Sequence, residues 1–284
     1  MSTSIRGWDV RRHRPPGVTP LEVWNLPVQG RELWELLGAP HVEADRRAGV
    51  PESALASRLL PALSGALETL VRRHAVDAVW LSGGLACLEG FGPALAQVPL
   101  PCPVHVAAEP RFAPALAGPR VLAPLRPSRP IAVDVGQTSI KCAAPGALRV
   151  FERDTAVLPL LFIGQPRPAD GHHIPSAVRF IAGALRAFVQ QERPPDAVCL
   201  ALPCPLDDAL VPGGCTYGWE GHASLVADIV REAGLPDAGG TVLVLNDAEL
   251  AAEAAREDAR LVGARRVLCL TLGFGPGGAL LERG

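Results

Sequence analysis

Lysine and asparagine are almost absent from this chain of 284 residues. Of its 27 basic residues only Lys141 is a lysine, and Asn25 and Asn246 are the only asparagines. The bias toward Arg, Ala, Pro and Gly is typical of a GC-rich coding sequence. Because an ammonium is a compact point charge and a guanidinium is a planar fork, the two are not interchangeable at a tight phosphate. The lone lysine is therefore a candidate for a specific chemical role.

A surplus of charge is missing as well. The 27 basic and 29 acidic side chains give a formal net charge of −2, whereas binders of nucleic acids or anionic membranes usually carry a basic surplus. No run of about 18 apolar residues lacks a charge, a proline or a glycine, so we expect no membrane-spanning helix. The polar first fourteen residues contain no signal-peptide pattern, so we expect a cytoplasmic protein. Nucleic-acid and membrane partners are not expected.

Several well-known catalytic motifs are also lacking. The chain has no G-x-x-x-x-G-K-[ST] loop, no G-x-S-x-G elbow, no H-E-x-x-H pair and no protein-kinase loop, which excludes a P-loop enzyme and these other classes. The seven cysteines form no C-x-x-C pair, and most lie in apolar runs. We therefore expect buried free thiols rather than a clustered zinc site.

The hydrophobic pattern alternates between short apolar strands and amphipathic helices. This alternation predicts an α/β fold, and 48% hydrophobic residues are enough for one large domain or two lobes. Residues 117–130 contain four prolines, so we expect a linker without a regular element. Helices are expected at 51–74, 176–191, 225–233 and 248–260, and strands at 78–81, 104–106, 131–133, 140–143, 148–153, 197–202, 241–245, 267–272 and 279–282.

The segment from Asp134 to Lys141 joins two of these strands. A hairpin with Gly136 lets the backbone approach a ligand, and backbone N–H groups near Gln137 together with the hydroxyl of Thr138 could hold phosphate oxygens. Asp134 would hold Mg²⁺ through water, and Lys141 would add positive charge. An ordinary β-turn with an Asp and a Gly in it is the competing interpretation.

The segment 272–278 carries Gly273, Gly275, Gly277 and Gly278 after an apolar strand. It matches the letters G-x-G-x-x-G, but Pro276 interrupts it, and no helix pattern or acidic residue about 20 positions later follows, as a dinucleotide-binding site would need. A glycine hairpin beneath a phosphate fits better, and a flexible loop is the alternative.

Three further strands end in polar or small residues. Asn246 and Asp247 follow the strand at 241–245 and precede a helix, so Asp247 is either a catalytic acid or base at a strand end or an N-cap. Pro203 follows the strand at 197–202, ahead of Trp219 and Glu220, and Gly83 and Gly84 follow the strand at 78–81. Taken singly, each of the last two segments is consistent with an ordinary turn.

Together these segments resemble the sugar kinase, hsp70 and actin ATPase superfamily, and within it the ROK group of sugar kinases and glucokinases. Residues 131–141 are similar to its first phosphate motif, 198–207 with 219–221 to its sugar-side turn, 241–253 to its Asn-Asp helix start, and 268–284 to its second phosphate motif. Residues 77–84 are similar to its late adenosine-side strand and Gly-Gly turn. The resemblance implies a two-lobed actin/hexokinase-like ATPase fold with ribonuclease H-like mixed sheets.

The order of the segments departs from that family. About 130 residues precede the first phosphate motif, and the second lies near residue 284. We therefore expect a circular permutation, in which residues 1–122 supply the C-terminal half of the fold, 123–130 a linker, 131–245 the N-terminal-type lobe and 246–284 the start of the C-terminal-type lobe. A fusion of an unrelated domain to a truncated lobe is the alternative. Gln137 and Cys204 replace glycines usual in the family, and its Glu-x-Gly-His motif and zinc cysteines are not recognisable.

The resemblance implies an ATP-dependent carbohydrate kinase that uses ATP and Mg²⁺. Asp247 would be the catalytic base, and the sugar-like small molecule would contact Asn246, Asp247, Pro203, Trp219 and Glu220. ATP would contact Asp134, Gly136, Gln137, Thr138, Lys141, Thr271, Gly273, Gly275, Gly277, Gly83 and Gly84, with Mg²⁺ held by Asp134 through water. A homodimer is left open as the assembly, and a non-catalytic nucleotide or sugar sensor with the same fold is the alternative function.

Overall fold

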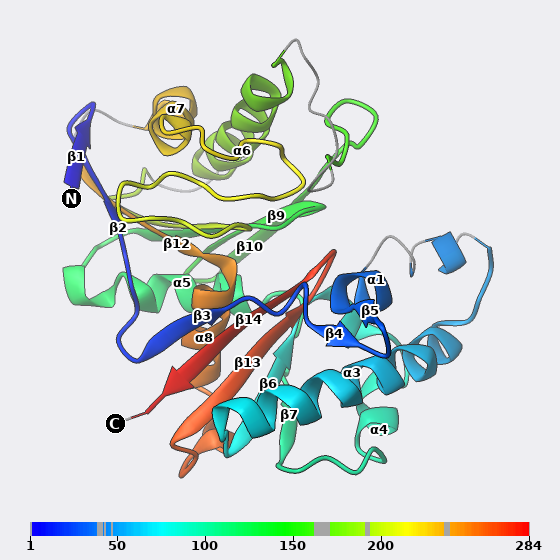
Figure 1. Cartoon of the computed structure of the whole chain (residues 1–284). Helices are drawn as coiled ribbons and strands as arrows, with labels where there is room; N and C mark the ends of the chain where they lie inside the picture. The colour runs from blue at the N-terminus through cyan, green and yellow to red at the C-terminus, as the bar shows by residue number, and fades with distance from the viewer. Residues whose placement is uncertain are drawn as a thin grey trace. The chain divides into compact units, whose positions relative to one another are not determined.

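The computed structural model describes residues 2–38, 42, 44–46, 48–161, 171–190, 194–235 and 239–283. The chain divides into two compact units (Figure 1). Unit 1 comprises Met1–Arg14 and Ala115–Leu250, and unit 2 comprises Pro15–Pro114 and Ala251–Gly284. Each unit has its own sheet and core and is described by itself. The fold is mixed α/β, which confirms the class expected from the alternating pattern.

Unit 1 is built on a seven-stranded sheet. Its strand order is β1-β2-β12-β11-β8-β9-β10. Strands β8, β11, β12 and β2 are parallel, while β9 pairs antiparallel with β8, β10 with β9, and β1 with β2. The strands are β1 (Ser2–Ile5), β2 (Trp8–Arg12), β8 (Pro130–Val135), β9 (Ser139–Ala144), β10 (Ala147–Glu152), β11 (Ala197–Leu202) and β12 (Gly240–Asn246).

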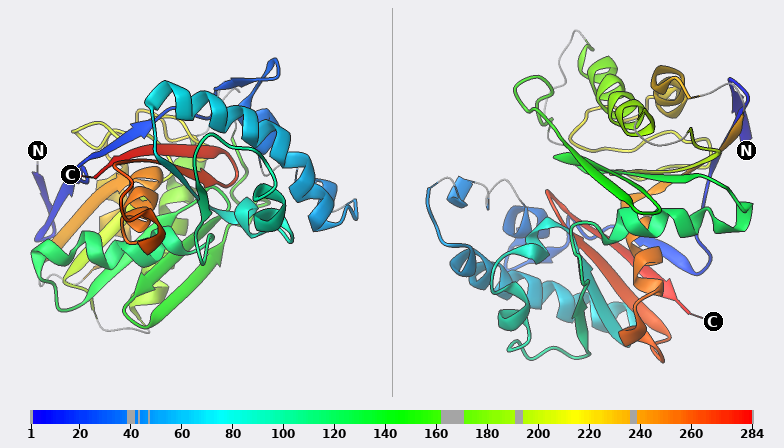
Figure 2. Two further views of the ribbon diagram at one scale, coloured as in Figure 1. Left: turned by 90° about the horizontal axis from the view of Figure 1, so that it is seen from below. Right: turned by 180° about the vertical axis from the view of Figure 1, so that it is seen from behind.

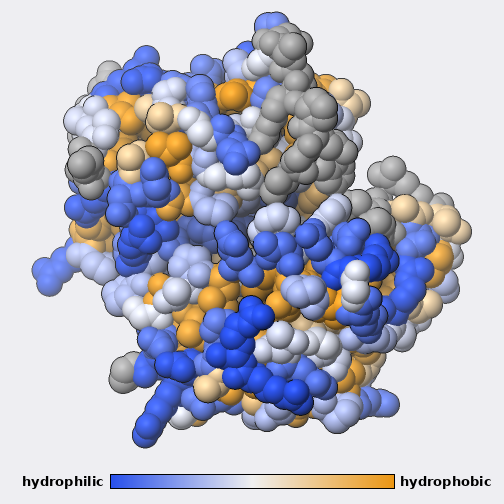
Figure 3. Space-filling model, viewed as in Figure 1, coloured by the Kyte–Doolittle hydropathy of each residue, from blue (hydrophilic) through white to orange (hydrophobic). Residues whose placement is uncertain are grey.

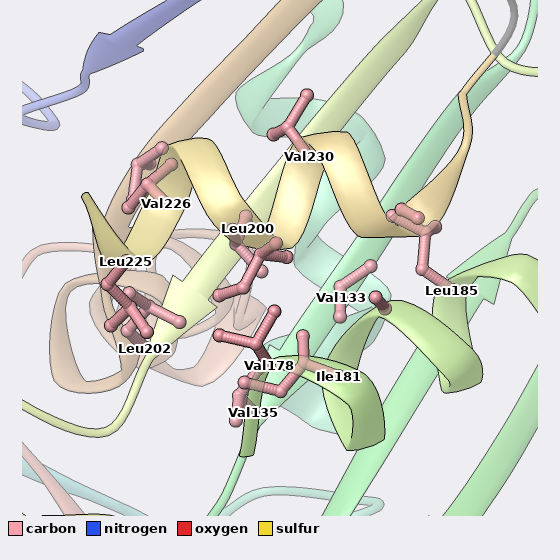
Figure 4. Close-up of a cluster of buried hydrophobic side chains, with 14 of the residues drawn as sticks. Val133, Val135, Val178, Ile181, Leu185, Leu200, Leu202, Leu225, Val226 and Val230 are labelled. Carbon is pink, nitrogen blue, oxygen red and sulfur yellow. The ribbon is translucent and has the colours of Figure 1, made fainter. Parts of the chain in front are cut away.

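Helices cover both faces of this sheet. Helices α6 (His173–Val189) and α7 (Leu225–Ala233) lie on one face, and α5 (Ala113–Val121) lies on the other, as both views show (Figures 1 and 2). The α6 and α7 side chains pack against alternate residues of β8 and β11, which point to one face because strand side chains alternate (Figure 4). This packing forms the hydrophobic core that fixes where the strands end.

Unit 2 is built on a five-stranded sheet in the order β3-β14-β13-β6-β7. Strands β13, β6 and β7 are parallel, whereas β14 pairs antiparallel with both β13 and β3. Helix α3 packs its buried leucines and alanines into the core of this unit. The elements are β3 (Val18–Leu21), β4 (Pro27–Val28), β5 (Arg31–Glu32), α1 (Leu33–Leu37), α3 (Glu52–His74), β6 (Ala78–Ser82), α4 (Phe91–Leu95), β7 (Val104–Val106), β13 (Arg266–Leu272) and β14 (Pro276–Glu282).

The two sheets share one pattern of pairing. Along the sheet of unit 1 from β10 to β12, the first two pairings are antiparallel and the next two are parallel. Along the sheet of unit 2 from β3 to β7, the pairings follow the same order. In unit 1 the first three strands are consecutive in the chain, whereas in unit 2 β13 and β14 come from the C-terminal part and β3 from the N-terminal part. Helix α8 (Asp247–Arg256) begins in unit 1, and its later residues belong to unit 2.

The proline-rich segment 117–130 corrects one expectation. It is not free of regular structure, because α5 extends to Val121 with Pro119 inside it, and a 3-10 turn follows at Ala123–Leu125. A Cβ on Gly118 would lie 2.2 Å from the Cβ of Ala132, so the helix meets β8 at very close range. This packing offsets the hydrogen bond that Pro119 cannot make.

The N-terminal segment contains strands that the sequence pattern did not predict. Residues 1–14 belong to unit 1, where β2 pairs with β12, and β3 belongs to unit 2. The functional division at residues 122, 130 and 245 stays a prediction, since the compact units follow sheet pairing rather than motif order. The expected helix at 176–191 is α6, although residue 191 lies outside the described residues.

Within the described part of the chain, one helix is long and apolar enough by composition to cross a membrane. It is α3, which carries Pro61 and has half of its most apolar window buried in the structure. The core helix of a globular unit has the same length and composition, and ten residues of α3 are buried. The visible surface is covered largely by hydrophilic side chains, with smaller hydrophobic patches between them (Figure 3).

Candidate functional site

The first hairpin of unit 1 brings the lone lysine beside an acid. Strand β8 ends at Val135 and β9 begins at Ser139, so residues 136–138 form the connection. Asp134 and Lys141 are register partners, and the Lys141 Nζ lies 3.4 Å from the Asp134 Oδ2. Their side chains are only 7% and 14% exposed, so this ion pair is mostly shielded from solvent.

Gly136 is required by the space around it. A Cβ at this position would lie 3.0 Å from the Ser139 carbonyl oxygen and 3.1 Å from the Lys141 Nζ. A larger residue would therefore push the lysine away from its place beside the hairpin. The glycine supports the predicted close approach of backbone and charge at this turn.

The side chain of Gln137 is already engaged within the unit. Its Nε2 donates to the Pro203 carbonyl at 3.1 Å, and its Oε1 accepts from the Thr216 N–H at 3.1 Å and from the Thr216 hydroxyl. Gln137 thus ties the hairpin to the turn after β11. Because the side chain is engaged, only the backbone of Gln137 could make the predicted contact with ATP. Thr138, the next residue, is exposed.

Asn246 caps helix α8 and anchors the same turn. Its Oδ1 accepts from the Ala248 N–H at 2.9 Å, and its Nδ2 donates to the Cys204 carbonyl at 2.8 Å. The Asn246 N–H donates to the Glu249 carboxylate at 2.7 Å, so the helix start is held both by the Asn246 side chain and by the Glu249 side chain. Asn246 is therefore the N-cap residue of α8, a role that the sequence pattern also allowed for Asp247. The predicted contact between Asn246 and the substrate stays a prediction.

Asp247 is the carboxyl with the most altered acidity in this cluster. It is partly buried and accepts from the Ala248 N–H at 2.8 Å. Burial raises its pKa to about 7, and the negative charge of Asp134 adds to the rise, while Lys141 and the Ala248 amide oppose it. A carboxyl with a pKa near neutrality can accept a proton at physiological pH.

A buried ion pair supports this helix start. The Arg12 guanidinium lies 2.6 Å from Glu249, and their side chains are 5% and 1% exposed. Arg12 lies on β2, and it binds Glu249, the residue that accepts the hydrogen bond from the Asn246 N–H at the start of α8. Sequence reasoning missed this pair, because 237 positions separate its members and only the pairing of β2 with β12 brings them together.

Trp219 and Glu220 occupy different environments. Trp219 is fully buried and stacks on Tyr217 with ring centroids 4.4 Å apart, whereas Glu220 is exposed. Trp219 therefore shapes this region by packing in the core of unit 1, and its predicted substrate contact stays a prediction. Cys204 interacts with the Cys215 thiol, and burial raises the pKa of Cys204. None of the seven cysteines forms a disulfide, and five of them are buried.

The second group of predicted residues lies together in unit 2. Thr271 is the register partner of both Ser82 and Gly277, so the ends of β6, β13 and β14 meet there. Gly83 has a φ of +97°, and a Cβ on it would lie 2.4 Å from the Leu272 carbonyl oxygen. Gly273 and Gly275 connect β13 to β14, while Gly84 opens a 3-10 turn.

The predicted site residues thus fall into two clusters, one in each unit. Each cluster lies at the carboxyl ends of parallel strands, where α/β proteins place their ligands. Among the described residues no group of three or more His, Cys, Asp and Glu side chains could hold a metal ion. Mg²⁺ usually keeps several of its waters and takes few protein carboxylates, and the predicted role of Asp134 in holding it through water stays a prediction.

Comparison with known proteins adds no family to this picture. A scan against protein-family models finds none that matches the chain, and a search of curated proteins finds no match. The function is therefore inferred from the two clusters of residues.

Proposed function

We propose that this protein is an ATP-dependent phosphotransferase that acts on a hydroxyl of a sugar or sugar-like molecule. We further propose that its two units are the lobes of a circularly permuted actin/hexokinase-like ATPase fold, as in the ROK kinases that the motifs resemble. The proposal places the reacting groups in unit 1 and assigns Thr271, Gly273, Gly275, Gly277, Gly83 and Gly84 of unit 2 to ATP.

The repeated strand pattern supports the fold part of this proposal. Both sheets have two antiparallel pairings followed by two parallel ones. In unit 2 the pattern is completed by β3, which pairs with β14 although the two strands come from opposite ends of the chain. A permuted duplication explains this arrangement, whereas a fusion of an unrelated domain would not require the two patterns to match.

Asp247 is the observation that carries the proposed reaction. Its pKa of about 7 comes from burial and from the charge of Asp134, and Asn246 has taken the capping role. In the ionised form Asp247 would accept the proton of the acceptor hydroxyl as that oxygen attacks the terminal phosphorus. Phosphoryl transfer depends mainly on positioning and charge neutralisation, so few other groups are needed.

The hairpin and its charges would bind the phosphates. Backbone N–H groups at residues 136–138 would face phosphate oxygens, and the Lys141 ammonium would offset negative charge beside them. Asp134 would hold Mg²⁺ through water. When bound, Mg²⁺ neutralises charge on the transferring phosphates.

A coupled ADP-release assay on Asp247→Ala tests this proposal. General-base loss should lower kcat by about 10²- to 10⁴-fold. Asp208→Asn is the matched control, because Asp208 is an exposed carboxylate of the same unit that pairs with Arg14; its activity should stay within about twofold, as expected for a surface pair of little energetic weight. Activity of Asp247→Ala within about tenfold of the wild type would exclude Asp247 as the base.

The second candidate is a nucleotide or sugar sensor without turnover. The absence of a recognisable Glu-x-Gly-His motif favours it. Calorimetry with ATP·Mg and a panel of sugars distinguishes the two, because binding without ADP release supports the sensor. For either function we propose a cytoplasmic protein with a small-molecule partner, without nucleic-acid or membrane partners, and a homodimer is tested by its mass in solution.

A further inference from the structure

The guanidinium of Arg153 lies directly behind the hairpin and uses all five of its N–H donors. Nη1 donates to the Gln137 carbonyl at 2.9 Å and to the Thr216 hydroxyl at 3.0 Å. Nε donates to the Leu158 carbonyl at 2.9 Å, and Nη2 donates to the carbonyls of Pro159 and Thr216 at 2.6 and 3.1 Å. With every donor satisfied, the guanidinium is held in one orientation.

This cation is buried without a carboxylate partner among the residues that the structure describes. Arg153 is 6% exposed, and burial lowers its pKa. The groups that counter this effect on the Arg153 pKa are Tyr217 and Cys215. A buried and uncompensated positive charge is costly, and here carbonyl dipoles hold it beside the hairpin.

Tyr217 contacts both the cation and the hairpin. The Arg153 Cζ lies 4.0 Å from the centroid of the Tyr217 ring, and this ring stacks on Trp219 at an interplanar angle of 5°. The Tyr217 hydroxyl donates to the Gly136 carbonyl at 2.8 Å. Two consecutive hairpin carbonyls, those of Gly136 and Gln137, are therefore bound by two stacked side chains.

Peptide geometry determines which way the N–H groups of Gln137 and Thr138 point. No peptide bond described in the chain is cis, and in a planar trans peptide the N–H points opposite to the C=O. Because the Gly136 carbonyl faces Tyr217, the Gln137 N–H points away from Tyr217. Because the Gln137 carbonyl faces Arg153, the Thr138 N–H points away from Arg153. Consecutive N–H groups turned to one side form an anion-binding concavity.

The side chain of Gln137 completes the restraint. It bonds to the Pro203 carbonyl and to Thr216, and Thr216 in turn binds the Arg153 guanidinium. A glycine here, as is usual in the family that the motif resembles, would lack these contacts. In this chain the hairpin is thus fixed from behind by Arg153, Tyr217 and Gln137.

We propose that Arg153 and Tyr217 are positioning residues for a polyphosphate bound on the open side of the hairpin. They hold the carbonyls of Gly136 and Gln137 inward, so the N–H groups of Gln137 and Thr138 face the ligand, and Arg153 adds a buried positive charge behind them. This inference rests on the proposed function for the identity of the ligand, the triphosphate of ATP.

The test uses the full chain with inorganic tripolyphosphate and Mg²⁺, followed by ATP. Tyr217→Phe keeps the stacked ring but removes the hydroxyl that bonds to Gly136 and interacts with Arg153, and it should weaken tripolyphosphate binding by about 3- to 10-fold. Arg153→Lys keeps the charge but loses the fork, and Arg153→Gln loses both, so we expect losses of about 10-fold and about 100-fold. In NMR spectra the ligand-induced shift of the Gln137 amide should shrink in Tyr217→Phe, and that of Thr138 in Arg153→Lys.

Arg149→Gln is the matched control. Arg149 lies on the neighbouring strand β10 and over an aromatic ring, with its Cζ 5.2 Å from the Phe151 centroid, but it is exposed. Its removal should leave the affinity within about twofold. With ATP, the positioning variants should raise KM more than they lower kcat, whereas a general loss of structure would lower the thermal midpoint and the active fraction together.

The outcomes separate this inference from the proposed reaction. If folded Tyr217→Phe and Arg153→Lys bind tripolyphosphate as the wild type does, the inference is wrong, and the kinase proposal stands. If the wild type binds and the variants do not, but no phosphoryl transfer occurs, the inference is supported and the kinase proposal fails. Where the Arg153 variants do not fold, Tyr217→Phe decides. A wild type without tripolyphosphate binding contradicts the inference, whatever its turnover.

Discussion

Two parallel strands of unit 1 end on charged side chains, whereas two parallel strands of unit 2 end on a hydroxyl and a glycine. Strands β8 and β12 lead to Asp134 and Asp247, with Lys141 alongside on β9. Strands β13 and β6 instead lead to Thr271 and Gly83. The two sheets share one pairing pattern, so the two groups of strand ends can be compared on a common arrangement of strands.

The difference indicates that the same arrangement of strands is stabilised in two different ways at its ends. Charged groups in unit 1 need other elements to hold them, which the Arg12–Glu249 pair and the Arg153 network provide. The end of unit 2 is shaped mainly by close backbone contacts, such as that between Gly83 and Leu272. Substitutions should therefore act through charge in unit 1 and through steric strain in unit 2.

The largest effect on stability is expected from Glu249→Gln. The substitution leaves the Arg12 guanidinium buried without its partner, and breaking such a pair costs about 3–5 kcal/mol of unfolding free energy. Urea unfolding measures the loss. Glu232→Gln is the control, because its pair with Arg186 is 47% exposed on both sides, and such a pair contributes less than about 1 kcal/mol. If both variants lost the same unfolding free energy, the buried ion pair would stabilise unit 1 no more than the exposed pair does.

The next effect separates two adjacent glycines of unit 2. Gly83→Ala should cost about 2 kcal/mol, because the new Cβ would meet the Leu272 backbone at a positive φ. Gly84→Ala should change stability by less than about 0.5 kcal/mol, because no atom lies within 4 Å of its Cβ position. Thermal unfolding of both variants measures the difference.

The same pair of variants tests the nucleotide assignment. If ATP binds over this turn, Gly84→Ala should raise the KM for ATP while leaving the thermal midpoint unchanged, since the added methyl group points into open space. A Gly83→Ala variant as stable as the wild type would contradict the steric account of unit 2.

Local patterns predicted the parts of this fold that depend on local residues. The strand at 104–106 and the helix at 225–233 have the predicted bounds, and α8 follows β12 where the Asn-Asp pair indicates. Strands β1 and β2 were missed, because their hydrophobic pattern is short and their partner β12 lies more than 200 residues away. The expected linker at 117–130 was wrong where α5 continues to Val121, because tertiary packing at Gly118 outweighs the local signal of Pro119.

The candidate site shows the same division between local and distant information. Lys141 was singled out because it is the only lysine, and the structure places it beside Asp134. Tyr217 is likewise the only tyrosine, so the same argument from rarity could have found it. No such signal marks Arg153 among 26 arginines, and its role emerges only from the bonds that it makes to carbonyls.

The pH dependence of Asp247→Asn tests whether unit 1 holds a destabilised charge. The folded protein holds the Asp247 proton up to a pH of about 7, because burial and Asp134 raise the pKa, whereas the unfolded chain releases it near pH 4. Between these values the folded state binds more protons than the unfolded state, so this residue lowers stability progressively as the pH rises. Asn cannot ionise and keeps an oxygen for the Ala248 N–H. The variant should therefore be close to the wild type in stability at pH 4 and more stable than the wild type at pH 8, where the wild type has lost the proton that its folded state holds.

Unfolding curves of both proteins across this pH range measure how their difference in stability grows. The activity should instead require the ionised form of Asp247, and kcat/KM measures this. Wild-type turnover should rise through pH 7 as Asp247 ionises, and the stabilised Asn variant should show no such rise. Asp208→Asn again serves as the control, because the Arg14 guanidinium lowers the pKa of Asp208, so its effect on stability should have the opposite sign. If Asp247→Asn were less stable than the wild type at pH 8, the ionised carboxylate would be stabilised by its surroundings, and unit 1 would not hold a strained base at all.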